Sequence, residues 1–172
     1  ATTEIYTIAY TLSLHDALPI SGRGMWLSAR GDVLEGAINR GAFTRAARGP
    51  VVLPPGLAAS LQQGLRARIA DLLGLARRAG QAVAGWQAVR EWRAVDRIAL
   101  LVQAKDGSAA ERERLSGGGM AAIAPLSAAE LGRVFGRDHI VHVAVAPGRL
   151  AEAIRSEAGR LSGLVPLDET KS

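Results

Sequence analysis

The sequence predicts an α/β domain in which helices cover both faces of a mixed β-sheet. Between Leu57 and Gly163, segments with helical apolar spacing alternate with short, mostly apolar runs. Such an alternation of strands and helices is typical of α/β folds. The chain has 172 residues, of which 48% are hydrophobic. This is enough for one domain of ordinary size with an additional smaller segment.

The first expected element of this domain is a long helix over 57–78. Apolar residues recur there every three or four positions, and Gly80 provides a stop. Gly64 and Gly74 weaken the helix and are candidate breaks. The segment 81–85 that follows is expected to be a short strand or a turn.

A second helix is expected over 86–95, and the continuous apolar run over 97–104 predicts a strand buried in a covered sheet. Ser108 is placed to cap the next helix. After a further short strand, Ser127 and Glu130 have the three-residue spacing of a capping box.

The last strand is expected over 139–146 and a final amphipathic helix over 148–163, followed by a loose tail at 164–172. Upstream, 22–50 is a small basic unit, in which Ser28 can cap a helix that ends near Gly41. The Pro- and Gly-rich segment 51–56 is expected to be a linker, because its two consecutive prolines forbid a continuous helix.

Positive charge is concentrated in the first half of the chain. Residues 22–97 hold 12 Arg against 5 acidic residues, a net charge of +7, whereas residues 98–172 hold 9 basic and 9 acidic residues. A localised basic half suggests a polyanionic partner. The alternative interpretation is a solvated, arginine-rich surface.

Residues for catalysis or metal binding are scarce in the sequence. There is no cysteine, which excludes disulfides and thiolate metal sites and fits a cytoplasmic protein. No run of about 18 apolar residues is present, so no transmembrane helix is expected. His139 and His142 would point to opposite faces of a strand, so they are expected to be a strand-end residue and a hydrogen-bonded core or edge histidine. No catalytic residue, metal ligand or cofactor is therefore predicted.

Two places combine Arg, Gly and Trp in a way that suits nucleic acid. In Gly22–Trp26, glycines allow close approach of a phosphate, Arg23 can pair with it, and Trp26 can stack on a base. The alternative is a tight turn with Trp26 anchoring a small core. Near Gly85 a helix begins beside Arg77 and Arg78, and the alternative there is an ordinary corner that a surface tryptophan covers.

Three stretches resemble the kink-turn RNA-binding ribosomal protein family, and its bacterial YlxQ-type members most closely. They are LLGLARRAGQAVAGWQAVREW, IALLVQAKDGS and LGRVFGRDHIVHVAVAPGRLAEAI, and the resemblance covers 57–163. It implies a three-layer α/β/α sandwich that binds RNA.

In that family the RNA contacts come from the start of the second helix and from the loop after the last strand. On this chain the resemblance implies contacts from Gly80, Gln81, Gly85, Trp86, Gln87 and Arg90, and from Ala146, Pro147, Gly148 and Arg149. Strong kink-turn binders carry Asn-Glu and, three residues later, Lys, where this chain has Gln87, Ala88 and Glu91. Glu91 would oppose a phosphate, which argues against specificity for kink-turns. The resemblance therefore implies RNA binding in general.

The stretch GRGMWLSARGDVLEGAINRGAFTRAARG is similar to the C-terminal part of the YlxR family of small basic bacterial proteins. Its first five residues meet the family pattern Gly-Arg-Gly-x-[Tyr/Trp]. A YlxR part joined to a ribosomal-protein-like domain is a known bacterial arrangement. Proteins with this arrangement are usually called nucleic-acid-binding proteins. Within this part the predicted RNA contacts are Arg23, Trp26, Arg30, Arg40, Arg45 and Arg48.

Residues 1–21 resemble the translation of a short-read sequencing adapter rather than the first half of a YlxR domain. The period-two alternation around Tyr6 otherwise favours a strand. This segment is expected to be an artefact that takes no part in fold or function. The YlxR-like piece, a small α+β unit, is therefore expected to be truncated.

These observations predict a non-catalytic, cytoplasmic bacterial RNA-binding protein linked to transcription or translation. The expected partner is ribosomal RNA or another structured RNA, with no membrane and no small-molecule substrate. One alternative is a DNA-binding protein of nucleoid or regulatory type. Another is the RNA-recognition fragment of an RNA-modifying enzyme.

Overall fold

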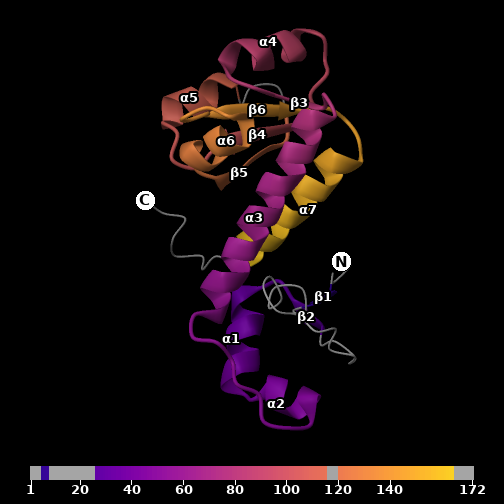
Figure 1. The fold of residues 1–172 in the computed structure, drawn as a ribbon, viewed down its shortest axis with the longest axis vertical. Helices are drawn as coiled ribbons and strands as arrows, with labels where there is room; N and C mark the ends of the chain where they lie inside the picture. The colour runs from indigo at the N-terminus through magenta and orange to yellow at the C-terminus, as the bar shows by residue number, and fades with distance from the viewer. Residues whose placement is uncertain (1–4, 8–25, 116–119, 165–172) are drawn as a thin grey trace. The chain divides into compact units, whose positions relative to one another are not determined.

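The computed structural model describes residues 5–7, 26–115 and 120–164 (Figure 1). It confirms the predicted α/β class and the mixed sheet. The division into three layers stays a prediction. None of the described helices has both the length and the apolar character needed to cross a membrane.

The chain forms two compact units. The first unit takes the described residues up to Gly64 together with those from Arg160 onward, and the second unit is Leu65–Gly159. Within the first unit, Gln62 Nε2 donates a hydrogen bond of 3.0 Å to the carbonyl oxygen of Leu164. The segment 51–56, which the sequence predicts as a linker, lies inside the first unit.

The sheet of the second unit has the strand order β3-β6-β4-β5. Strands β4 and β5 are parallel, whereas β6 pairs antiparallel with both β3 and β4, so the sheet is mixed. All residues of β4 and β6 are buried, which is typical of strands covered on both faces. The elements are α3 (Leu57–Arg78), β3 (Ala82–Ala84), α4 (Trp86–Ala94), β4 (Leu100–Ala104), α5 (Ala109–Leu115), β5 (Ala122–Leu126), α6 (Ala128–Phe135), β6 (His142–Val145) and α7 (Arg149–Leu164), with α3 and α7 extending into the first unit.

Helix α3 continues through Gly64 and Gly74, so the candidate breaks are wrong. A helical glycine costs about 1 kcal/mol relative to alanine. The helix also has a fully buried face, on which Ile69 and Leu73 show no exposed surface. Burial of one such side chain contributes about 1.5–3 kcal/mol, which outweighs the cost of a glycine.

Two of the three predicted helix caps are confirmed. Ser127 and Glu130 form the complete capping box at the start of α6. The Ser108 hydroxyl accepts a hydrogen bond of 3.2 Å from the backbone N–H of Glu111 at the start of α5. Ser28 is not a cap, because it is paired in a strand and the N-cap of the next helix is Arg30, which makes no side-chain cap.

The described part of the first unit begins with β1 (Ile5–Thr7), which pairs antiparallel with β2 (Trp26–Ser28). Two short helices follow, α1 (Gly31–Asn39) and α2 (Ala42–Ala47). Gly41 separates them in the left-handed conformation, so it ends α1 as expected and also begins α2, which the sequence does not predict. Phe43 of α2 is buried.

The core on the α4 side of the sheet brings together Val89 of α4, Leu115 of α5, and Leu101 and Ala144 of the central strands. Trp92 packs against this cluster and is partly buried. Helix α4 is therefore fixed to the sheet through its Val89 face.

Gly132 in α6 lies where a side chain has no room. A Cβ at this position would stand 2.5 Å from the carbonyl oxygen of Arg137 and 2.7 Å from that of Asp138. Both obstacles are backbone atoms of the turn that follows α6. This turn therefore depends on the absence of a side chain at Gly132.

We expect Gly132→Ala to lower the free energy of unfolding by about 1–3 kcal/mol, because the backbone after α6 must shift. Gly159→Ala is the matched control, since a Cβ on this helical glycine would meet nothing within 4 Å. It should raise stability by up to about 1 kcal/mol through helix propensity. Urea unfolding of both variants measures the two effects, and equal effects would contradict the close packing at Gly132.

Candidate nucleic-acid interface

The start of α4 is shaped by Gly85. Its φ of 96° lies in a region that favours glycine, and its N–H donates a hydrogen bond of 2.8 Å to the carbonyl oxygen of His142 in β6. No side chain caps the helix that begins at Trp86. The start of α4 is therefore joined to β6 by the backbone of Gly85.

Trp86 is 39% exposed and is the central side chain at this helix start. The guanidinium carbon of Arg90, one turn later, lies 5.9 Å from the centroid of the indole ring. The ring of His142 lies 6.0 Å away at an interplanar angle of 56°. An indole with a cation and a second ring near it, and with 39% of its surface exposed, can present a face to a nucleobase.

The polar residue next to Trp86 has an internal partner. Gln87 Nε2 donates a hydrogen bond of 3.1 Å to Glu91 Oε1, one turn along α4. Both side chains are exposed. The Glu91 carboxylate, expected to oppose a phosphate, is thus paired with a neutral amide, and its charge remains.

A second group of predicted residues meets at the other end of β3. Ala146 donates its N–H to the carbonyl oxygen of Gln81 at 2.9 Å, which brings the loop after β6 beside the turn at Gly80. Gly80 has a φ of 65° and Gly148 has a φ of 142°, so both turns favour glycine. Pro147 in this loop is exposed.

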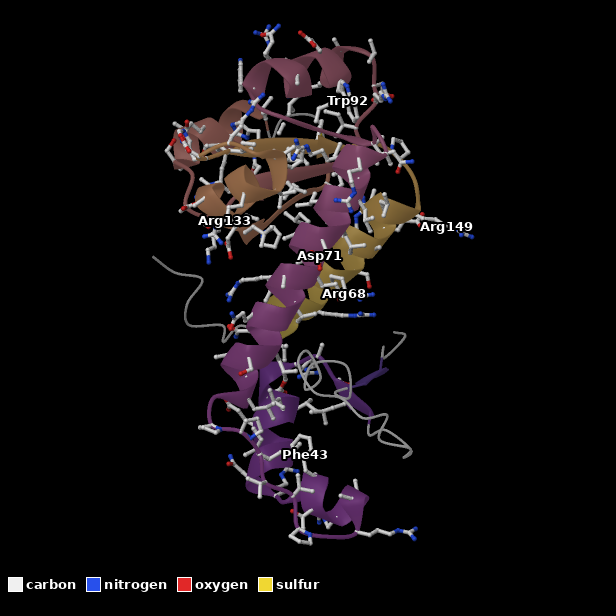
Figure 2. The ribbon with its side chains drawn as sticks, in the orientation of Figure 1. Phe43, Arg68, Asp71, Trp92, Arg133 and Arg149 are labelled. Atoms are coloured by element: carbon white, nitrogen blue, oxygen red, sulfur yellow. The ribbon has the colours of Figure 1, made fainter. Side chains whose placement is uncertain are left out.

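Arg149 begins α7 and is exposed, and Figure 2 shows its side chain extending away from the helix. The Gly80 and Gly85 groups flank the same strand, which has only three residues. At about 3.3 Å per residue, Gln81 and Gly85 stand roughly 13 Å apart along it. The structure therefore brings the two predicted groups together on one edge strand.

Arg77 and Arg78 at the end of α3 differ in their surroundings. Arg77 Nη1 donates a hydrogen bond of 2.7 Å to the carbonyl oxygen of Val134, and its guanidinium lies 5.9 Å from the centroid of the Phe135 ring. Arg77 thus stabilises the C-terminus of α6, where a cation is favourable. Arg78 is exposed, and its side chain makes no hydrogen bond within the described residues.

The predicted contacts of the first unit are exposed arginines on and around α1 and α2. Arg30 forms a two-point ion pair with Asp32 at 2.7 and 3.0 Å, and this hydrogen bonding lowers the pKa of Asp32. Arg45 donates to the backbone oxygen of Arg40 at 3.0 Å. Arg48 has a φ of 54° at the end of α2.

Two of the predicted contacts in the first unit are not placed as side chains. Arg23 lies outside the described residues, and only the backbone of Trp26 is described, in β2. The expected contacts from the Gly-Arg-Gly stretch therefore stay predictions.

Two residues beside the α4 start are absent from the contacts that the sequence predicts. His142 lies against the Trp86 ring, and Arg137 Nη1 would stand 3.3 Å from a Cβ on Gly85. Both follow Gly85 by a long stretch of chain, and only the β3–β6 pairing brings them there. Helical or strand periodicity carries no signal for such a neighbour.

His142 is buried, as expected for a core histidine, but the expectation that it is hydrogen-bonded is wrong for one atom. Its Nδ1 has no partner among the described residues. His139 precedes β6 and is exposed, so the two histidines do not share a strand. No group of three or more potential metal ligands occurs in the part of the chain that the structure describes.

Burial lowers the pKa of His142 from its ordinary 6.5, and the nearby Glu111 carboxylate opposes this shift. Just below pH 6.5, His142 therefore becomes protonated in the unfolded chain while it stays neutral in the folded protein. Acidification therefore lowers the free energy of unfolding. We expect unfolding free energies, measured in urea at about pH 7.5 and about pH 5.5, to fall less with acid in His142→Leu than in the wild type. An equal fall in both proteins would contradict the buried, neutral histidine.

No family model and no curated protein matches the chain. Among solved structures, the chain is similar to a protein of unknown function from Bacillus halodurans C, with 20% sequence identity and a TM-score of 0.49. The match covers 53% of this chain and 96% of that one.

Proposed function

We propose that this chain is a non-catalytic bacterial RNA-binding protein of the cytoplasm, which binds structured RNA such as ribosomal RNA. In this proposal the start of α4 provides the central contact, and the arginines of the first half hold the phosphate backbone. The resemblance to YlxR and YlxQ-type proteins links the function to transcription or translation. The exposed indole of Trp86 is the observation that carries the proposal.

The geometry around Trp86 supports single-stranded or looped RNA as the ligand. Trp86 keeps 39% of its surface exposed although α4 packs on the core through Val89 and Trp92. Base stacking on an aromatic side chain contributes about 1–3 kcal/mol. Sequence-specific RNA recognition uses loops and bulges, whose unstacked bases are available for such contacts.

The charge along the chain and the backbone conformation in the second unit both support phosphate contacts. The net charge of residues 22–97 is +7, from 12 Arg and 5 acidic residues. Gly80 and Gly148 have positive φ, and a Cβ on either would meet nothing within 4 Å. Backbone with open space above it can approach a phosphate closely.

We expect the full chain to bind an RNA hairpin with an internal loop with an affinity that falls steeply as salt rises. Each phosphate contact contributes about 0.7–0.9 to the slope of log affinity against log salt. Three or more contacts give a slope steeper than about −2. Fluorescence anisotropy over a salt series measures the slope, and weak binding at low salt with a flat slope would contradict the proposal.

The nature of the nucleic acid is tested by competition. A DNA duplex of the same length should displace the RNA hairpin only at clearly higher concentration. A perfect RNA duplex should also compete less well, because it offers no unstacked base to Trp86. Stronger competition by the DNA duplex would favour a DNA-binding protein instead.

We expect Trp86→Ala to weaken RNA binding about tenfold, which corresponds to the loss of one stacked base. Val95→Ala is the matched control, because Val95 is also an exposed apolar residue, 69% exposed, at the other end of α4. The control should bind as the wild type does. Anisotropy titrations compare the two, and equal affinities of both variants would place the stacking contact elsewhere.

A further inference from the structure

Arg137 lies beside Gly85, although neither composition nor sequence spacing connects them. The space that a Cβ on Gly85 would fill is 3.3 Å from Arg137 Nη1. The next residue is Trp86, whose Cα is about 3.8 Å along the chain. The guanidinium of Arg137 therefore stands at the start of α4, beside the backbone that leads into Trp86.

The backbone that carries Arg137 is held by several contacts. Its N–H donates a hydrogen bond of 2.9 Å to the carbonyl oxygen of Gly132, after Gly136 has reversed the chain at a φ of 70°. Arg77 donates to the carbonyl oxygen of Val134 at 2.7 Å, which ties the end of α6 to α3. Arg137 thus projects from a fixed turn.

Within the described residues, the Arg137 side chain has neither an ion pair nor a hydrogen bond. The ion pairs found there join Arg30 with Asp32 and Arg68 with Glu157. Asp138 follows Arg137 directly and is exposed, yet it is not paired with it. Arg137 is therefore a cation without an anionic partner in the part of the chain that the structure describes.

Several positive groups gather at the start of α4, although the Glu91 carboxylate lies one turn along the same helix. Arg137 stands beside Gly85, Arg90 lies over Trp86, and the start of α4 carries the positive end of the helix dipole. Like charges placed together repel one another and do not stabilise the fold. An anion at this place would remove the repulsion, and a phosphate also matches the planar fork of a guanidinium.

We propose that Arg137 binds the phosphate of the nucleotide whose base stacks on Trp86. The proposal rests on the proposed function, because it names a further contact of the same RNA. Trp86 receives the base and Arg137 receives the phosphate of one nucleotide. Gly85 lies between them, and the absence of a side chain there lets the guanidinium of Arg137 approach the start of α4.

The principal test compares Arg137→Ala with Arg133→Ala in the full chain. Arg133 lies one turn earlier, in the last turn of α6, is exposed and makes no side-chain hydrogen bond within the described residues. Figure 2 shows Arg133 on the opposite side of the second unit from Arg149. The two substitutions remove the same charge from neighbouring turns, so general electrostatic attraction changes equally.

With the looped RNA hairpin as probe, Arg137→Ala should weaken binding about tenfold and make the salt slope shallower by about 1. Arg133→Ala should lower affinity less than twofold, because it changes only the screened, general electrostatic attraction. Arg137→Lys should recover part of the affinity, because the charge remains and the two-point geometry is lost. Thermal unfolding checks that the variants stay folded.

A double variant tests whether one nucleotide makes both contacts. If Trp86 and Arg137 hold the same nucleotide, the loss in Trp86→Ala/Arg137→Ala is smaller than the product of the two single losses. Losses that multiply would overturn the shared nucleotide. Equal affinities of Arg137→Ala and Arg133→Ala, with a wild type that binds RNA, would overturn the role of Arg137 alone, whereas a wild type without salt-dependent RNA binding would overturn the proposed function as well.

Discussion

Two backbone hydrogen bonds, one at each end of β3, hold the candidate interface together. The N–H of Ala146 donates to the carbonyl oxygen of Gln81, and the N–H of Gly85 donates to that of His142. Both join β3 to β6, the strand that also pairs with β4 in the centre of the sheet. Because the ladder is only three residues long, a shift of register would move both groups of predicted contacts at once. The geometry of the interface therefore depends on the β3–β6 pairing.

Glycines set how closely the surrounding segments approach. Gly132 brings the turn after α6 against its own helix, and Gly85 leaves space for the guanidinium of Arg137. The two are connected, because the turn that Gly132 permits is the one that carries Arg137. Close packing without side chains thus determines where a charged group stands at the start of α4.

The arginines of the chain have different physical roles, which their number alone does not distinguish. Arg77 stabilises the end of α6 through the carbonyl oxygen of Val134, and Arg30 is paired with Asp32. Arg137 has no such partner within the described residues, and Arg90 lies over an exposed ring. A surface arginine already paired with a carboxylate contributes less to binding a polyanion than an unpaired one, since the internal partner must first be displaced.

The sequence by itself determined the class of fold, because helical and strand periodicities follow from local burial. It also determined the capping box at Ser127 and Glu130, because that motif depends only on two residues that stand three positions apart. It did not locate Ser28 in a strand, where pairing with another segment outweighs a local cap. Only the tertiary structure placed His142 beside Trp86 and Arg137 beside Gly85, because strand pairing and the turn after α6 bring together residues that are distant along the chain. It also left the Nδ1 atom of His142 without a partner among the described residues.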